Sequence, residues 1–158
     1  MDLVVEESNI ELFHECVSII FAELYKNFPI AVPINALVLL GVEDVRARII
    51  EIEQWKQTDH KEMVMLATLK WLLSVGYILS KSEHLHFGSA AKMVLSPVSL
   101  EALKVNVFPN KEEKKSIGDK LINAVASGGK KAMVSLSSAA LSTLATTGTS
   151  QLINHLHL

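Results

Sequence analysis

Two histidine pairs have the spacing that comes closest to metal-binding chemistry. His84 and His86 are one residue apart, as are His155 and His157, and side chains two positions apart on a strand share one face. A zinc site needs at least three protein ligands, and only Glu83 stands beside the first pair. We therefore interpret the first pair as the polar side of a strand and the second as chance near a terminus. We predict no metal and no cofactor.

The single cysteine offers no catalytic pairing. Cys16 and His14 lie two residues apart on an expected helix, where such side chains do not face one another. We interpret Cys16 as a small buried thiol. The sequence has no glycine-rich phosphate loop and no serine-centred nucleophile motif. Its start lacks the basic and apolar regions of a secretory signal. We expect a protein that is not an enzyme and that resides in the cytoplasm.

Charge is unevenly distributed along the 158 residues. Residues 1–60 hold four basic and eleven acidic side chains and sum to −7, whereas the remaining residues sum to +5. A phosphate backbone would be repelled by the first part and tolerated by the second. Any DNA contact should therefore come from lysines beyond residue 60. The candidates are Lys61, Lys70, Lys81 and Lys92.

Apolar residues at helical spacing predict four helices in the first half of the chain. We expect them over about 9–26, 34–40, 43–55 and 59–75. Ser8 begins a Ser-x-x-Glu capping box at the first helix, and Gly76 ends the last. Trp55 and Trp71 fall at helical spacing with other apolar residues, so we expect both to pack in the core. A partly exposed tryptophan would instead mark an interface.

The spacing changes from helical to alternating after Gly76, which predicts a β-hairpin. The expected strands are 77–80 and 84–87, joined by a turn at 81–83. Residues 92–95 form a further strand or extend the second one after a bulge. Ser96 and Pro97 then begin a short helix that reaches about Val105, because proline suits a first helical turn.

The order of these elements resembles a winged-helix domain over roughly residues 9–106. Residues 69–78 read as a leucine-rich helix that ends in glycine, an aromatic residue and isoleucine, as before a wing. Residues 94–103 match the return strand and closing helix. The resemblance implies a mainly α (α+β) fold with a β-hairpin wing, of an uncharacterised bacterial type with a small-residue tail. It also implies that the helix before the wing would enter the major groove.

The second region is compositionally distinct. We predict a winged-helix-like domain over 1–109, and over 110–158 a charged linker followed by a tail rich in alanine, serine and threonine. Ser116 should cap a helix that breaks at Gly128-Gly129. No charged side chain follows Lys131.

Three interpretations of the tail remain open. It is an amphipathic helix packed on its own domain or on a second copy, a disordered segment, or a membrane-active one. Residues 132–147 are too short and too rich in serine for a membrane span. The candidate interface residues are Met133, Leu136, Leu141 and Leu144.

The sequence leaves three hypotheses for the function of the protein. We expect a protein-interaction or regulatory module that binds a protein partner or forms homo-oligomers through the tail. The alternative is a winged-helix DNA-binding transcription regulator, although the helix before the wing has no arginine, asparagine or glutamine to read bases. A third hypothesis is a membrane-associating effector or immunity-type protein.

Overall fold

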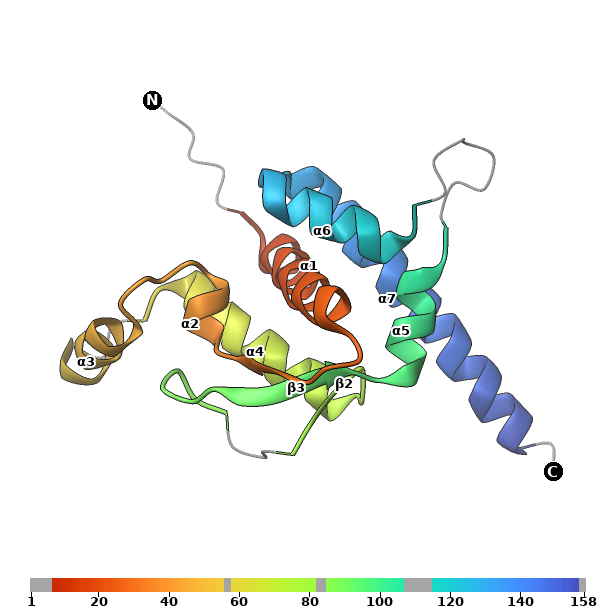
Figure 1. The fold of residues 1–158 in the computed structure, drawn as a ribbon, viewed down its shortest axis with the longest axis horizontal. Helices are drawn as coiled ribbons and strands as arrows, with labels where there is room; N and C mark the ends of the chain where they lie inside the picture. Colours follow the sequence, from red (N-terminus) through yellow and green to blue (C-terminus); the bar gives the residue numbers. More distant parts are fainter. Residues whose placement is uncertain (1–6, 56–57, 82–84, 107–114, 157–158) are drawn as a thin grey trace.

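The protein is mainly helical, with a small three-stranded antiparallel sheet (Figure 1). The computed structural model describes residues 7–55, 58–81, 85–106 and 115–156, with side chains in the last helix described up to residue 147. The α+β class predicted from the sequence is confirmed.

Seven helices lie in the described part of the chain. They are α1 (Asn9–Asn27), α2 (Ala36–Leu39), α3 (Val45–Trp55), α4 (His60–Ser74), α5 (Pro97–Lys104), α6 (Ile117–Ser127) and α7 (Lys130–Leu156). Polar side chains cap several of them, as the sequence predicted. Ser8 accepts from the Glu11 N–H, and Ser96 accepts from the Ser99 N–H. Gly128 ends α6 with a φ of 71°, a conformation that favours glycine.

The sheet has the order β1-β3-β2. Its strands are β1 (Val32–Ile34), β2 (Ile78–Ser80) and β3 (Ala91–Leu95). Leu79 pairs with Val94, and Pro33 pairs with Lys92. Alternate residues of β3 are buried, so one face of the sheet covers the core and the opposite face is open.

The sequence predicted a second strand over 84–87, and this prediction is wrong for residues 85–87, which are the part of it that the structure describes. Leu85, His86 and Phe87 belong to no strand, and β2 pairs with β3 instead. Local hydrogen bonds compete with strand pairing there, since the Ser89 hydroxyl accepts from the His86 N–H. The Asn35 amide also donates to the carbonyls of Phe87 and Ser89 at 2.7 and 3.0 Å, which ties this loop to the start of α2.

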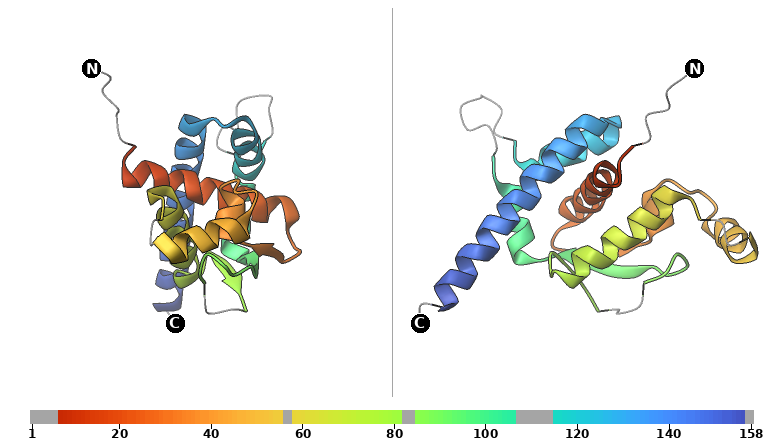
Figure 2. Two further views of the ribbon diagram at one scale, coloured as in Figure 1. Left: turned by 90° about the vertical axis from the view of Figure 1, so that its left-hand side faces the viewer. Right: turned by 180° about the vertical axis from the view of Figure 1, so that it is seen from behind.

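Helix α1 forms the centre of the molecule. It lies between α6 and α7 on one side and α4 with the sheet on the other (Figures 1 and 2). Its fully buried side chains include Ile20, Phe21 and Leu24. Burying each such side chain stabilises the fold by about 1.5–3 kcal/mol. The hydrophobic cluster around them takes residues from α4, the sheet, α5, α6 and α7.

Helix α7 packs on α1 through a face of small residues that includes two polar contacts. Ser18 donates to the Met133 carbonyl at 2.7 Å, and the His14 imidazole lies 2.9 Å from the Ser137 hydroxyl. Both serines are completely buried. Because buried polar groups need partners, these two contacts favour one register of α7 along α1.

The tail is helical and longer than the sequence predicted. The predicted domain boundary at 109/110 falls in 107–114, outside the described residues. The helices on its two sides share one hydrophobic cluster, in which Ile117 and Leu144 pack with α1 residues.

Gly118 marks the closest approach between α6 and α1. A Cβ atom at this position would lie 2.5–2.6 Å from the ring carbons of Tyr25. The same tyrosine is held by its hydroxyl, 3.1 Å from the Ser116 hydroxyl. Only glycine therefore allows α6 to sit this close to α1.

We expect Gly118→Ala to lower the free energy of unfolding by about 1–3 kcal/mol, because the Tyr25 ring must move. Chemical denaturation measures this loss. Gly129→Ala is the matched control, since the nearest atom to its Cβ is 3.6 Å away; it should cost about 0.5 kcal/mol or less. Equal losses in the two variants would contradict the close packing.

Candidate functional site

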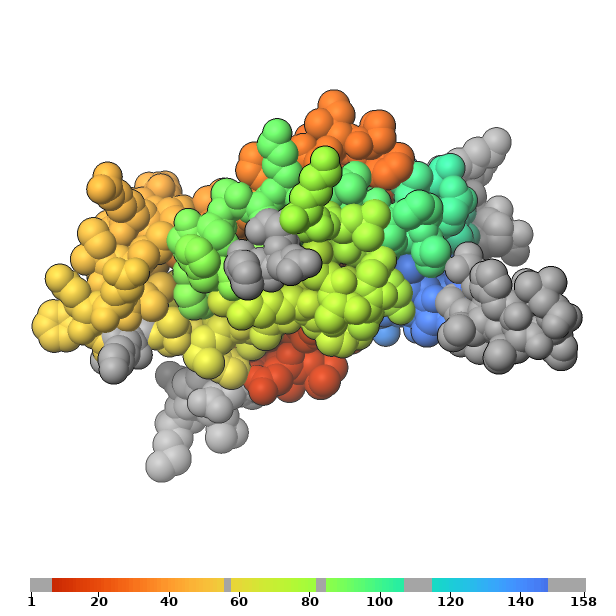
Figure 3. Space-filling view, turned by 90° about the horizontal axis from the view of Figure 1, so that it is seen from below, coloured from red at the N-terminus to blue at the C-terminus, as the bar shows by residue number. Residues whose placement is uncertain are grey.

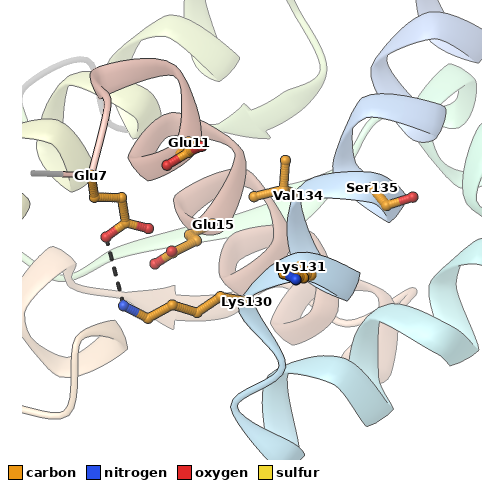
Figure 4. A pocket seen from close by; sticks show the side chains of 7 residues that line it. All are labelled: Glu7, Glu11, Glu15, Lys130, Lys131, Val134 and Ser135. Carbon is orange, nitrogen blue, oxygen red and sulfur yellow. Dashed lines mark ion pairs between the residues drawn. The ribbon is translucent and has the colours of Figure 1, made fainter. Parts of the chain in front are cut away.

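A charged pocket lies between the beginnings of α1 and α7 (Figure 4). Its volume is about 560 Å³. The residues that line it come from the two helix starts and are mostly charged. They are Glu7, Glu11, Glu15, Lys130, Lys131, Val134 and Ser135. Lys130 reaches across the opening to Glu7, with 3.7 Å between Nζ and Oε2.

Glu15 is the unusual member of this pocket, because only 1% of it is exposed. Its Oε2 accepts a hydrogen bond from Lys61 Nζ at 3.2 Å. Burial and the neighbouring Glu7 carboxyl group raise the pKa of Glu15, whereas Glu15 and the nearby lysines lower the pKa of Glu7. The second oxygen of Glu15, Oε1, is buried without a hydrogen-bond partner among the described residues.

Two carboxylates of this pocket form ion pairs within the chain. Glu7 and Glu15 already have lysine partners in Lys130 and Lys61. Among the described side chains, no three metal-binding groups lie close enough to hold an ion. The pocket lies at the α1–α7 junction, and the spacing of Glu11 and Glu15 on one face of α1 could have drawn attention to it from the sequence.

The four lysines proposed for DNA contact are divided between two sides of the molecule. Lys61 points toward α1 and pairs with Glu15. Lys70 lies nine residues further along α4, which is the opposite side of the helix. Lys70 lines a groove of about 410 Å³ beside β2, and Lys81 and Lys92 line an adjoining groove of about 610 Å³. Only these three could contact one strand of nucleic acid together.

The expectation that both tryptophans pack in the core is wrong. Trp55 is 71% exposed and Trp71 is 40% exposed. The Trp71 ring makes T-shaped contacts with the rings of Phe13 and Tyr77. Trp55 belongs to α3, a helix in which no residue is buried.

One side of α3 is fully open and partly apolar. We call this the α3 face; it consists of Ala47, Ile50, Glu51, Gln54 and Trp55, all of which are exposed. The five positions fall within about 140° of the helix circumference. The helix is held to the body chiefly by Arg48, whose Nε lies 3.0 and 3.1 Å from the two carboxylate oxygens of Glu62.

The candidate interface residues of the tail are already used within the chain. Met133 and Leu144 are buried, and Leu136 and Leu141 are half-buried against the core. Ser137, which was not among these candidates, is completely buried on the same face of α7.

The histidine pairs and Cys16, which the sequence analysis considered for metal binding or catalysis, belong to none of these sites. The His86 imidazole accepts a hydrogen bond from the Gly88 N–H. His84, Glu83 and the side chains of His155 and His157 lie outside the described residues. Cys16 is fully buried, and burial raises the pKa of its thiol to about 12. It is therefore an inert part of the core at neutral pH.

No protein-family model matches the chain, and no curated protein or solved structure is detectably similar to it. Among the described residues, no helix combines the length and the apolar character needed to cross a membrane.

We expect Glu15→Gln to stabilise the protein at pH 8, by about 1 kcal/mol, because the neutral amide avoids burying an ionised carboxylate. The pKa of Glu15 is higher in the folded protein than in the unfolded chain. Protonated Glu15 therefore stabilises the folded state at low pH, and this stabilisation is lost as the pH rises through the folded-state pKa. The advantage of the variant should therefore shrink toward pH 5. Thermal unfolding at both pH values measures it.

Glu11→Gln is the control for this prediction, because Glu11 lines the same pocket but is exposed. It should show no comparable gain at pH 8. A Glu15→Gln variant that is less stable than the wild type at every pH would mean that Lys61 keeps the carboxylate ionised.

Proposed function

We propose that this protein is a non-enzymatic interaction module that binds a protein partner through the α3 face. The observation that carries the proposal is the 71% exposure of Trp55 on a helix without buried residues. Tryptophan is costly to leave in water and is the residue most enriched in binding hot spots. A partner that covers Ile50 and Trp55 would bury the apolar surface that the fold leaves open.

The surroundings of the α3 face support a specific protein contact. Glu51 lies between Ile50 and Trp55 on the same face, and its carboxylate is 2.9 Å from the Arg48 guanidinium. A polar rim around an apolar anchor is the usual anatomy of an interface. Arg48 also holds α3 on Glu62, so the face is presented in one orientation.

The winged-helix resemblance remains part of this proposal. The succession of α1, β1, α2, α3, α4, β2 and β3, and the sheet order β1-β3-β2, support it. The exposed side of α4, which such a domain would place in the major groove, carries Met63, Ala67, Lys70 and Trp71. With one lysine among apolar side chains, this surface favours protein over DNA.

We expect a photoreactive benzoylphenylalanine placed at position 55 to form a covalent adduct with a protein in the native cells. The same residue at position 105 is the control, because Val105 is 42% exposed at the end of α5, away from the α3 face. Electrophoresis and mass spectrometry identify the adducts. Adducts from both positions alike, or from neither, would contradict the proposal.

A second candidate, DNA binding, is favoured by the grouping of Lys70, Lys81 and Lys92 around β2. The two grooves that they line share Leu79 and Ser80, and none of the described residues in either lining is acidic. Three lysines on one surface can contact a phosphate backbone without reading its sequence.

If this surface binds DNA, affinity for duplex DNA should fall about 40-fold between 50 and 200 mM salt, as for three phosphate contacts. The triple variant Lys70→Glu, Lys81→Glu, Lys92→Glu should abolish binding. Lys104→Glu is the control, because Lys104 lies on α5. Fluorescence anisotropy with a labelled duplex measures both. No binding by the wild type at low salt would exclude this candidate.

A further inference from the structure

Two uncovered surfaces of this chain complement each other. The first is the α3 face, and the second is the groove on the open side of the sheet, which we call the sheet groove. We propose that the α3 face of one copy binds in the sheet groove of a second copy, so that the chain associates head to tail. This inference rests on the proposed function, because it names the partner of the α3 face.

The sheet groove is an apolar depression with a basic rim. Its volume is about 610 Å³. Leu79 of β2 is 46% exposed and faces its paired residue Val94 on the open side of the sheet. Lys81 and Lys92 are exposed at its margin. Its other lining residues are small: Ala31, Ser80, Ala90 and Ala91.

The α3 face has the opposite shape and charge. Trp55 and Ile50 project from a helix that stands at one end of the molecule, while β2 and β3 lie toward the middle of the same side (Figure 3). Acidic side chains outnumber basic ones in this part of the chain. Glu43, Asp44, Glu51, Glu53 and Asp59 lie on or beside α3 together with Arg46 and Arg48, and Arg48 is already paired with Glu51 and Glu62.

The fit between the two surfaces follows from size and charge together. A tryptophan side chain buries about 150–250 Å² when it enters an apolar site, and the small alanines leave room for it beside Leu79 and Val94. Glu51, which lies on the same face as Trp55, would then approach Lys81 or Lys92. Complementary charge selects the register and orientation of such a contact. Residues 1–60, which include α3, carry a net charge of −7, and the remaining residues, which include Lys81 and Lys92, carry a net charge of +5.

This geometry determines the kind of assembly. The α3 face and the sheet groove are different surfaces, so a pair of copies keeps one free α3 face and one free sheet groove. Heterologous contacts of this kind lead to rings or to open chains of subunits and do not stop at a dimer. An 11-residue helix on a three-stranded sheet makes a small interface, so we expect a dissociation constant in the range of about 10–100 µM.

Mixing two purified full-length variants tests the proposal by sedimentation velocity. The first, Ile50→Ser with Trp55→Ser, removes the projecting apolar side chains. The second, Lys81→Glu with Lys92→Glu, reverses the charge of the groove. All four positions are exposed, so neither variant should lose its fold. We expect the wild type to grow with concentration past the dimer and each variant alone to stay monomeric, its self-affinity at least about tenfold weaker.

The equimolar mixture is the decisive sample. The second variant keeps an intact α3 face and the first keeps an intact sheet groove, so together they should form a heterodimer that grows no further. Salt should weaken both the wild-type assembly and the heterodimer. The control, Val105→Ser with Lys104→Glu, should assemble like the wild type.

Three results would overturn the proposal. A wild type that stays monomeric at about 500 µM, well above the expected dissociation constant, excludes self-association. A monomeric mixture, or a groove variant that assembles like the wild type, excludes the head-to-tail contact. If position 55 nevertheless crosslinks to a different protein, the proposed interaction function stands while this inference fails. Duplex DNA that binds Lys81 and Lys92 of a monomeric protein assigns the groove to nucleic acid instead.

Discussion

The burial of α1 is the constraint on which the rest of this structure depends. Most of its length is covered, because α6 and α7 pack on one side while α4 and the sheet pack on the other. Side chains such as Phe21 and Cys16 have no exposed surface at all. A helix buried on several sides cannot be stable until the segments that cover it are in place. The second region of the chain is therefore part of the core and more than an appendage to it.

The same constraint explains the composition of α7. Its alanines and serines contribute little hydrophobic surface, but they allow a helix to lie close to α1. Ala140 and Ser137 are completely buried at this contact. The two hydrogen-bonded serines and the Glu7–Lys130 pair supply the specificity that large apolar side chains would otherwise provide. A tail whose composition suggests disorder is thus ordered by the helix that it covers.

Two surfaces remain outside this arrangement, and the proposed interactions use them. Helix α3 lies apart from α1 and buries no residue, and the outer side of the sheet exposes Leu79, Lys81 and Lys92. One surface presents Trp55 among carboxylates, and the other presents lysines beside Leu79 and Val94. The charged pocket at Glu15 differs from both, because Glu7 and Glu15 are paired with lysines of the same chain. This contrast is the reason why we propose partner binding on α3 and the sheet and not at the pocket.

The sequence by itself determined the helices and much of their extent. The Ser8 and Ser96 caps, Pro97 and the glycines at positions 76 and 128 act through bonds to residues a few positions away, so local reasoning was sufficient. The periodicity also identified which residues share a helix face, as for Met133 and Leu144 in the tail.

Only the tertiary structure decided which of those faces are covered. Residues at helical spacing look alike whether a partner helix exists or not, which is why Trp55 was expected in the core. The pairing of Lys61 with Glu15, the burial of Glu15 and the pairing of β2 with β3 all depend on segments distant in the sequence. Their energies come from long-range packing and desolvation, which no short window of residues contains.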